Sequence, residues 1–194
     1  MIQYPKGQKQ LSRATRSQTM QTNYSSRGMG LENILNQTNE LYRLQKRAVI
    51  HKKPTPIQVV KVNYPARSAA QITEAYFRQA STTDYNGVYK GRYIDFEAKE
   101  TKNKTSFPLK NIHEHQLEHM KECYEQGGIA FVIFYFSSLK EYYLLEYKWI
   151  EQFVHDSSTN RQSIPLTYIK EHGQSISLSL QMTLNYLDAV DSLL

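Results

Sequence analysis

A short segment at residues 94–99 alternates apolar and charged side chains without a break. The apolar set is Ile94, Phe96 and Ala98, and the charged set is Asp95, Glu97 and Lys99. Successive side chains of a β-strand point to opposite faces. The segment therefore predicts a strand with one face in a core and the other face presenting two acids and a lysine.

The length and composition of the chain favour one folded domain. The chain has 194 residues, which is enough for a core, and its one cysteine, Cys123, excludes an intramolecular disulfide. A single free thiol is typical of a reducing, cytoplasmic location. The longest apolar run, residues 129–136, is too short to cross a bilayer, so no membrane partner is expected.

Charge is distributed unevenly between the two halves of the chain. Residues 1–110 contain 19 Lys/Arg and 7 Asp/Glu, whereas residues 111–194 contain 5 and 11. This asymmetry favours binding of a polyanion such as nucleic acid on one face. The alternative interpretation is a solvated basic surface.

The first 28 residues are basic and contain no acid. They show no apolar period, so we predict a flexible arm that lies along a phosphate backbone. An inert tail fits the same composition. Residues 29–194 are predicted to form a single domain.

Periodicity predicts a mixed α/β fold. Residues 30–47 have the 3- and 4-residue apolar spacing of an amphipathic helix, and a second helix is expected at 109–126, before Gly127. Prolines bracket a protruding, partly helical element at about 54–76. Strands are expected at 48–53, 57–64, about 76–84, 87–90, 92–100, 129–137 and 141–147. We expect a mixed central sheet flanked by helices.

The charged strand face suits metal-dependent hydrolysis of a phosphodiester. Mg²⁺ prefers oxygen ligands, and Glu97 with Asp84 on a neighbouring strand could supply two carboxylates. Thr82 shares the face of Asp84, two residues away. Lys99, two residues beyond Glu97, would stabilise charge that develops in the transition state.

Spacing leaves several alternatives open. Asp95 also lies on the face of Glu97 and rivals Asp84, and charges on an edge strand can simply discourage pairing. His115 and His119 are one helical turn apart, but solvated histidines are the favoured interpretation over a zinc site. Gln116 could reach the metal cluster with its amide oxygen, and Cys123 is interpreted as a buried helix residue.

Three runs of sequence resemble the RecU family of bacterial Holliday-junction resolvases. They are "SSRGMGLENILNQTNELY", "AVIHKKPTPIQVVKVNYP" and "AYFRQASTTDYNGVYKGRYIDFEAKETKNKTSFPLKNIHEHQLEHM", within about residues 24–137. The resemblance implies a restriction-endonuclease-like fold and a homodimer that cuts four-way junctions symmetrically with Mg²⁺. One or two ions per site, with Mn²⁺ as a substitute, are expected.

The resemblance also implies roles for particular residues. The family's metal ligands fall on Thr82, Asp84, Glu97 and Gln116, and its transition-state-stabilising lysine falls on Lys99. The element at 54–76 resembles the family's stalk, which enters the junction centre and here contains Arg67. Some relatives carry a lysine where this chain has Thr73. The residues from about 150 depart most from the family.

The sequence therefore predicts a structure-selective endonuclease that resolves Holliday junctions by paired nicks in recombination and repair. Backbone contacts and shape are expected to give the selectivity. The predicted DNA-binding residues are Arg27, Lys52, Lys53, Arg67, Lys90, Arg92, Lys102 and Lys104. A recombinase or branch-migration helicase is an expected partner, and the expected location is nucleoid-associated cytoplasm. The alternatives are a junction-binding module that modulates recombinase filaments without cutting, and an endonuclease of the restriction type that cuts linear duplex as well.

Overall fold

The fold is centred on one twisted mixed sheet. The computed structural model describes residues 30–66, 69–78, 82–156 and 162–194. Within these residues six strands form the sheet, in the order β1-β4-β5-β7-β8-β10. Their bounds are β1 (Val49–Lys52), β4 (Tyr85–Tyr89), β5 (Arg92–Thr101), β7 (Ile129–Phe136), β8 (Glu141–Glu146) and β10 (Gln174–Ile176). Only β5 and β7 pair in parallel, and the other pairs are antiparallel.

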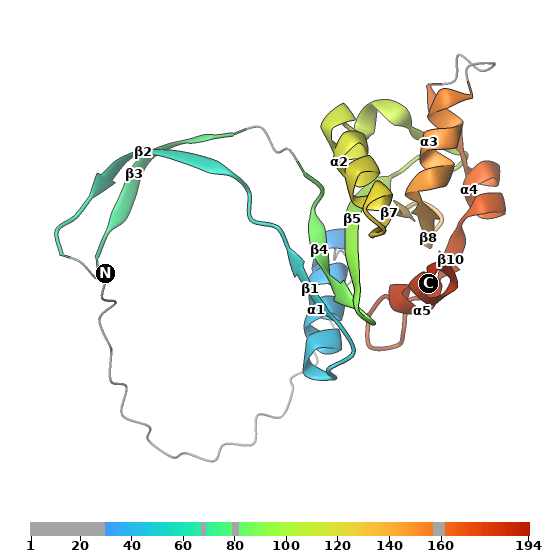
Figure 1. Ribbon diagram of the computed structural model, residues 1–194, viewed down its shortest axis with the longest axis horizontal. Helices are drawn as coiled ribbons and strands as arrows, with labels where there is room; N and C mark the ends of the chain where they lie inside the picture. The colour runs from blue at the N-terminus through green and yellow to red at the C-terminus, as the bar shows by residue number, and fades with distance from the viewer. Residues whose placement is uncertain (1–29, 67–68, 79–81, 157–161) are drawn as a thin grey trace.

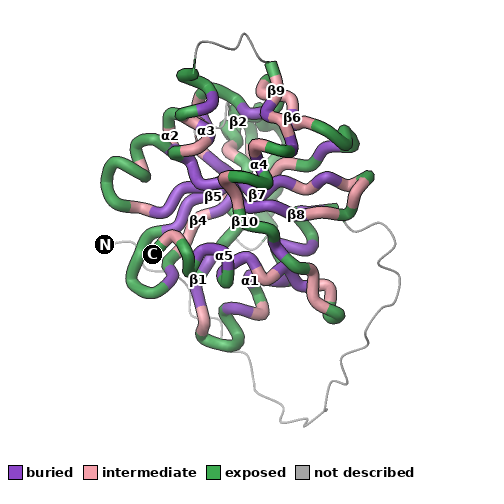
Figure 2. The backbone as a smooth tube through the Cα atoms, turned by 90° about the vertical axis from the view of Figure 1, so that its right-hand side faces the viewer, coloured by how far each residue is buried: buried purple, intermediate pink, exposed green. Residues whose placement is uncertain are grey.

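Helices cover both faces of this sheet, and each face has its own core (Figures 1 and 2). One core holds α1 (Leu31–Leu44) and α5 (Tyr186–Val190), and the other holds α2 (Glu114–Glu125), α3 (Tyr147–His155) and α4 (Leu166–His172). A mixed sheet between two helical layers confirms the predicted α/β class. None of the helices in the described residues is long and apolar enough to cross a membrane.

The apolar face of β5 packs where the alternation predicts. Ile94 and Phe96 are completely buried in the core beneath α1. Phe96 stacks between Tyr85 and Phe131, with ring centroids 4.8 Å from each. The opposite face of β5 consequently points toward α2.

A two-stranded hairpin extends from the body of the molecule. It consists of β2 (Ile57–Asn63) and β3 (Gln71–Phe77), which pair antiparallel and stand apart from the main sheet (Figure 1). The predicted protrusion at 54–76 is therefore present, but its partly helical character is wrong for 71–77. Ile72 and Thr73 are β-branched, and pairing with β2 satisfies the backbone that a helix would otherwise satisfy internally. We call this hairpin, residues 57–77, the stalk.

Other boundaries differ from expectation for identifiable reasons. The second helix begins at Glu114 rather than 109, because β6 (Ser106–Pro108) pairs with β9 (Ser163–Pro165) and a 3-10 turn, Leu109–Asn111, follows it. A second 3-10 turn, Asp191–Leu193, follows α5. The strand expected at 76–84 is also wrong, since residues 82–84 are irregular and β4 starts at Tyr85. The predicted arm, residues 1–28, lies outside the described residues, and the division at residue 28 stays a prediction.

Candidate active site

The polar face of β5 is enclosed by the helical layer above it. Asp95 is completely buried, and Glu97 is 2 % exposed. On the neighbouring strand, Asp95 and Glu97 are paired with the apolar residues Ala130 and Val132. Acids are rarely this buried unless they are paired with cations or hydrogen-bond donors.

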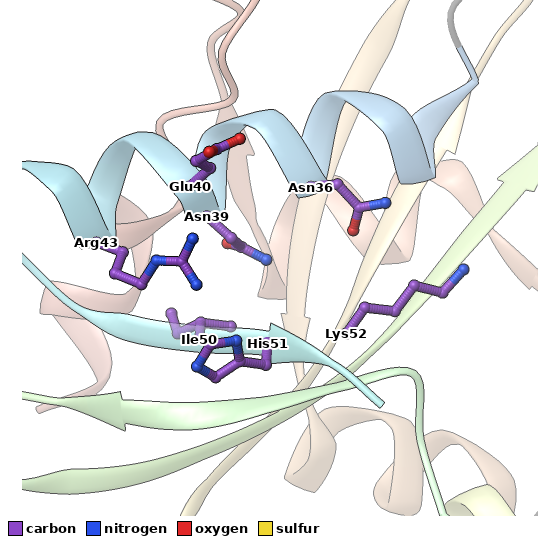
Figure 3. A pocket seen from close by; sticks show the side chains of 7 residues that line it. All are labelled: Asn36, Asn39, Glu40, Arg43, Ile50, His51 and Lys52. Carbon is purple, nitrogen blue, oxygen red and sulfur yellow. The ribbon is translucent and has the colours of Figure 1, made fainter. Parts of the chain in front are cut away.

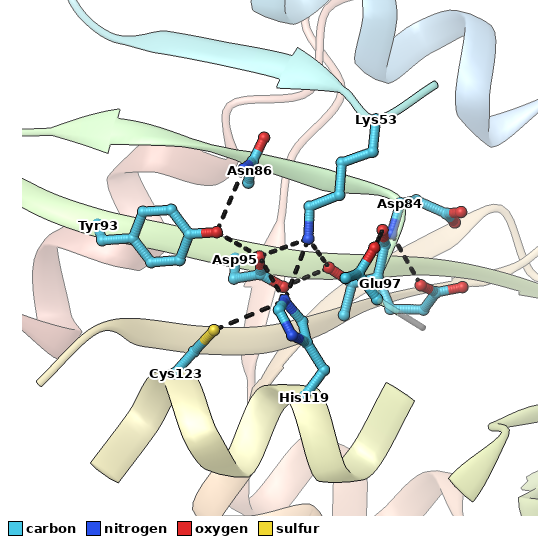
Figure 4. Close-up of polar contacts among 10 residues, drawn as sticks. Lys53, Asp84, Asn86, Tyr93, Asp95, Glu97, His119 and Cys123 are labelled. Carbon is cyan, nitrogen blue, oxygen red and sulfur yellow. Dashed lines mark hydrogen bonds and ion pairs between the residues drawn. The ribbon is translucent and has the colours of Figure 1, made fainter. Parts of the chain in front are cut away.

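Glu97 has two such partners. Its Oε2 accepts a hydrogen bond of 3.0 Å from the backbone N–H of Asp84, and its Oε1 lies 2.9 Å from Nζ of Lys99. Asp84 and Lys99 are only partly exposed. The predicted trio thus forms one group at the point where the chain enters β4, and Figure 4 shows Asp84 and Glu97 side by side there. The prediction that Thr82 and Asp84 share the face of a strand is wrong, because both residues precede β4.

The charge balance of this group favours a cation. Burial raises the pKa of Glu97, the Asp84 carboxylate raises it further, and Lys99 lowers it, with the result that the pKa is about 7. Two neighbouring carboxylates with one ammonium leave an excess of negative charge in a partly dry site. A hard divalent ion with oxygen ligands, such as Mg²⁺, fits this donor set.

The other two predicted ligands have local partners. The Thr82 hydroxyl donates to the carbonyl of Thr83 over 3.4 Å, and Gln116 Oε1 accepts the backbone N–H of His113 over 3.0 Å. The second contact is one half of a capping box at the start of α2. An amide oxygen has two lone pairs, so this bond leaves Gln116 an acceptor site. Thr82 and Gln116 stay predicted ligands.

Asp95, the rival of Asp84, belongs to a separate cluster. Its carboxylate accepts hydrogen bonds from the Thr83 hydroxyl and, over 2.8 Å, from the Tyr93 hydroxyl. Lys53 Nζ lies 2.7 Å from Asp95 Oδ2, and His119 Nε2 lies 3.2 Å from the same oxygen. Figure 4 shows Lys53 reaching in from the end of β1 and His119 reaching in from α2. We call these five residues the Asp95 cluster.

Sequence reasoning missed part of this cluster. The interpretation of His119 as a solvated histidine is wrong, because the ring contacts a completely buried carboxylate. Cys123 Sγ lies 3.6 Å from His119 Nε2, and the thiol is partly rather than fully buried. The two residues are four apart on α2, a spacing that places them on one face. His115 instead stacks on His113, with ring centroids 5.5 Å apart.

The predicted DNA-binding residues fall into different environments. Lys102 and Lys104 are exposed just beyond β5. Lys90 pairs with Asp191 at 2.7 Å, and Arg92 donates to the carbonyl of Gly127 over 2.9 Å. Lys52 forms an ion pair with Glu32 on α1, and Lys53 is held in the Asp95 cluster. Arg27 and Arg67 lie outside the described residues.

A shallow hollow lies between α1 and β1 (Figure 3). Its lining is polar apart from Ile50 and includes Lys52, but not Asp84, Glu97 or Lys99. The lining residues are Asn36, Asn39, Glu40, Arg43, Ile50, His51 and Lys52. The hollow therefore does not serve the carboxylate pair directly.

Comparison with known proteins gives a consistent family. The family model for recombination protein U matches residues 26–192. The chain is 54 % identical over 196 residues to a Holliday junction resolvase RecU from Geobacillus sp. (strain WCH70), covering 98 % of this chain and 96 % of the relative. It is 53 % identical to proteins of the same name from Geobacillus kaustophilus (strain HTA426), with 98 % and 96 % covered, and from Bacillus cereus (strain G9842), with 98 % and 97 % covered. The sequence resemblance is thereby confirmed, and the chain belongs to the RecU family.

Proposed function

We propose that this protein is a Holliday-junction resolvase, a structure-selective endonuclease that depends on Mg²⁺. The observation that carries the proposal is the group of Asp84, Glu97 and Lys99, in which a buried carboxylate lies beside a partly exposed one and a single ammonium. The relatives named Holliday junction resolvase support the choice of substrate. A buried acid next to a partly exposed acid and a lysine suits phosphodiester hydrolysis better than binding alone.

Asp84 and Glu97 would hold the ion, with Thr82 and Gln116 as further oxygen ligands. Bound Mg²⁺ supplies charge neutralisation and polarisation of the scissile phosphate. Lys99 Nζ, fixed by its contact with Glu97 Oε1, donates to the phosphoryl oxygens as their charge grows. Because Glu97 also accepts the N–H of Asp84, this one side chain orients both the lysine and the segment that carries the second carboxylate.

Paired nicks on opposed strands require two active sites, so we propose a homodimer with one site in each subunit. The stalk supports an additional interaction surface, because Val60, Ile72 and Phe77 are 53 %, 54 % and 82 % exposed. A recombinase or helicase partner and a nucleoid-associated, cytoplasmic location remain parts of this proposal.

A cleavage assay tests the proposal directly. The full chain is incubated with a mobile four-way junction and with a linear duplex of matched sequence, with and without Mg²⁺. We expect symmetric nicks in the junction only when Mg²⁺ is present, and little cutting of the duplex. Tight junction binding without cutting at any Mg²⁺ concentration would instead support the binding-module alternative. Equal cutting of both DNAs would support a restriction-type enzyme.

A further inference from the structure

Lys53 occupies an unusual position in the chain. It directly follows β1 and directly precedes Pro54, which begins the path to the stalk. Its side chain is only 15 % exposed, and its Nζ lies within 3.2 Å of three groups. These are Asp95 Oδ2 at 2.7 Å, the Thr83 hydroxyl at 3.0 Å and His119 Nε2 at 3.2 Å.

The backbone of Lys53 makes a second connection. Its N–H donates to the carbonyl of Asp84 over 2.7 Å. Asp84 in turn donates its own N–H to Glu97 Oε2. One residue at the root of the stalk therefore contacts the segment that carries Asp84 through its backbone, and β5 through its side chain.

The residues that Lys53 contacts lie next to the two proposed metal ligands in the sequence. Thr83, which Lys53 contacts, immediately precedes Asp84, and Asp95 lies two residues before Glu97 on β5. Residues 82–84 are irregular and precede β4, and the Lys53 N–H holds the Asp84 carbonyl by one backbone hydrogen bond next to the last β1–β4 pair. Side-chain contacts from Lys53 and Thr83 to the buried Asp95 carboxylate add a second attachment, to β5.

We propose that Lys53 is a positioning residue, which fixes Asp84 against Glu97 by tying residues 83 and 84 to β5 from the root of the stalk. The inference rests on the proposed function, since it concerns the metal-ligand pair. It also gives Lys53 a different role from the phosphate contact that the sequence predicts. A lysine whose ammonium is shielded and paired with a buried carboxylate is poorly placed to meet DNA.

The same geometry explains why this cluster needs no metal of its own. Asp95, His119 and Cys123 offer ligand atoms within 4.8 Å of one another, a spacing that is compatible with a metal site. The Lys53 ammonium, however, already lies against Asp95 and His119. It supplies the positive charge that the buried carboxylate requires.

The test compares four variants of the full chain with the wild type. Lys53→Met removes the ammonium but keeps the backbone N–H, and Lys53→Arg restores a cation. The double variant Lys53→Met with Asp95→Asn removes both charges, so no unpaired carboxylate is left buried. Lys170→Met is the control, because it breaks an ion pair between α4 and Glu141 of β8, two elements that do not carry the candidate metal site.

Three quantities are measured for each variant. They are Mg²⁺ binding to the DNA-free protein by calorimetry, the single-turnover cleavage rate of a junction, and junction affinity without divalent ions. The melting temperature reports folding. For Lys53→Met we expect Mg²⁺ affinity and cleavage to fall by about tenfold or more, the usual effect of removing a group that orients metal ligands. Junction affinity should change little, and Lys53→Arg should recover part of both losses.

The double variant separates positioning from folding. It should regain the melting temperature lost by Lys53→Met while Mg²⁺ affinity and cleavage stay low. If it regained both, or if Lys53→Met bound Mg²⁺ as Lys170→Met does, Lys53 would not be a positioning residue. A loss confined to junction affinity would return Lys53 to the DNA-binding residues. If the wild type failed to cut junctions, the proposed function would fail, whereas the calorimetric comparison would still decide the role of Lys53.

Discussion

At the residue scale, the two acids of β5 have the same local pattern but different surroundings. Asp95 and Glu97 are both buried on the face toward α2. The Asp95 carboxylate contacts one ammonium and three further side chains. Glu97 contacts Lys99 and the Asp84 backbone, and its pKa is raised to about 7. Because the Asp84 carboxylate also lies beside Glu97 and Lys99 supplies one ammonium, two carboxylates share one positive charge on the Glu97 side of the strand.

The first prediction concerns the two proposed carboxylate ligands. Asp84→Asn or Glu97→Gln should abolish detectable junction cleavage, because each change removes one charged oxygen ligand from the Mg²⁺ site. Junction affinity should be retained or slightly increased. Cleavage and gel-shift assays with Mg²⁺ and Ca²⁺ measure the two effects, and Glu141→Gln on β8 serves as a surface control. Near-normal nicking by Asp84→Asn would contradict the assignment of Asp84 as a metal ligand and make Asp95 the candidate ligand.

The second prediction concerns Lys99. Lys99→Ala should reduce the single-turnover cleavage rate by about 10²-fold, the scale expected when one donor to the transition state is removed. Mg²⁺ should still bind, since an ammonium is not a ligand. Lys148→Ala on α3, which breaks an ion pair with Glu146, is the matched control. A Lys99→Ala protein that turns over like the wild type would show that this lysine only balances charge.

At the element scale, the stalk is connected in sequence on both sides to strands that form the candidate site. β1 leads into β2, and β3 leads back through residues 82–84 to β4. The carboxylate Asp84 therefore lies at one root of the stalk and Lys53 lies at the other. This arrangement allows the stalk and the candidate metal site to be built from one continuous segment of the chain.

The third prediction tests what the stalk recognises. Replacing residues 60–74 by Asn-Gly keeps the Val59–Ala75 pair and closes a short hairpin with a favoured two-residue turn. The shortened protein should lose junction cleavage far more than duplex binding, because a linear duplex has no open centre for a protrusion to fill. Both DNAs are titrated at two salt concentrations. Arg67→Ala is the companion variant that removes charge but not length.

Equal losses on junction and duplex would contradict this role for the stalk. In that case the stalk would be one more basic surface. The slope of log K against log salt concentration would then become shallower by about 0.9 for each phosphate that is no longer neutralised. Selectivity would then have to arise in the cleft of the proposed dimer.

At the scale of the whole molecule, buried tyrosines join the N-terminal helix to the C-terminal segment. The Tyr42 hydroxyl on α1 donates to the carbonyl of Leu184 over 3.1 Å, and its ring packs edge-on against Tyr186 at 5.4 Å. Burial raises the pKa of Tyr42 to about 12. The ends of the described chain are thus held together by groups that must stay neutral.

The fourth prediction is a loss of stability at alkaline pH. Below pH 10 Tyr42 is protonated in both the folded and the unfolded chain, and its full contribution to the free energy of unfolding is present. Between pH 10 and 12 the unfolded chain loses this proton while the folded chain keeps it, so the free energy of unfolding falls. For Tyr42 alone the loss is about 1 kcal/mol at pH 11.

Urea unfolding at pH 9 and pH 11 measures this effect. The free energy of unfolding of Tyr42→Phe should fall less between the two pH values than that of the wild type does. Tyr64→Phe, at a side chain that is 70 % exposed, should follow the wild type. If the free energy of unfolding of Tyr42→Phe fell as much as that of the wild type, the Tyr42 hydroxyl would ionise as easily in the folded protein as in the unfolded chain.

The sequence by itself determined the two faces of β5, the α/β class and the family. These depend on local period, on composition and on runs of identity, which survive without coordinates. It also singled out Glu97 and Lys99 as partners, because residues two apart on a strand must share a face. It did not determine the boundaries around residues 82–84, where irregular backbone replaces the strand that was expected.

Only the tertiary structure decided which groups the two acids of β5 contact. The partners of Asp95 come from a residue 42 positions earlier, Lys53, and from one 24 positions later, His119. The N–H that reaches Glu97 belongs to Asp84, 13 positions away. Spacing along a strand cannot rank two acids on the same face. Their environments differ through groups that strand pairing and helix packing bring in from elsewhere in the chain.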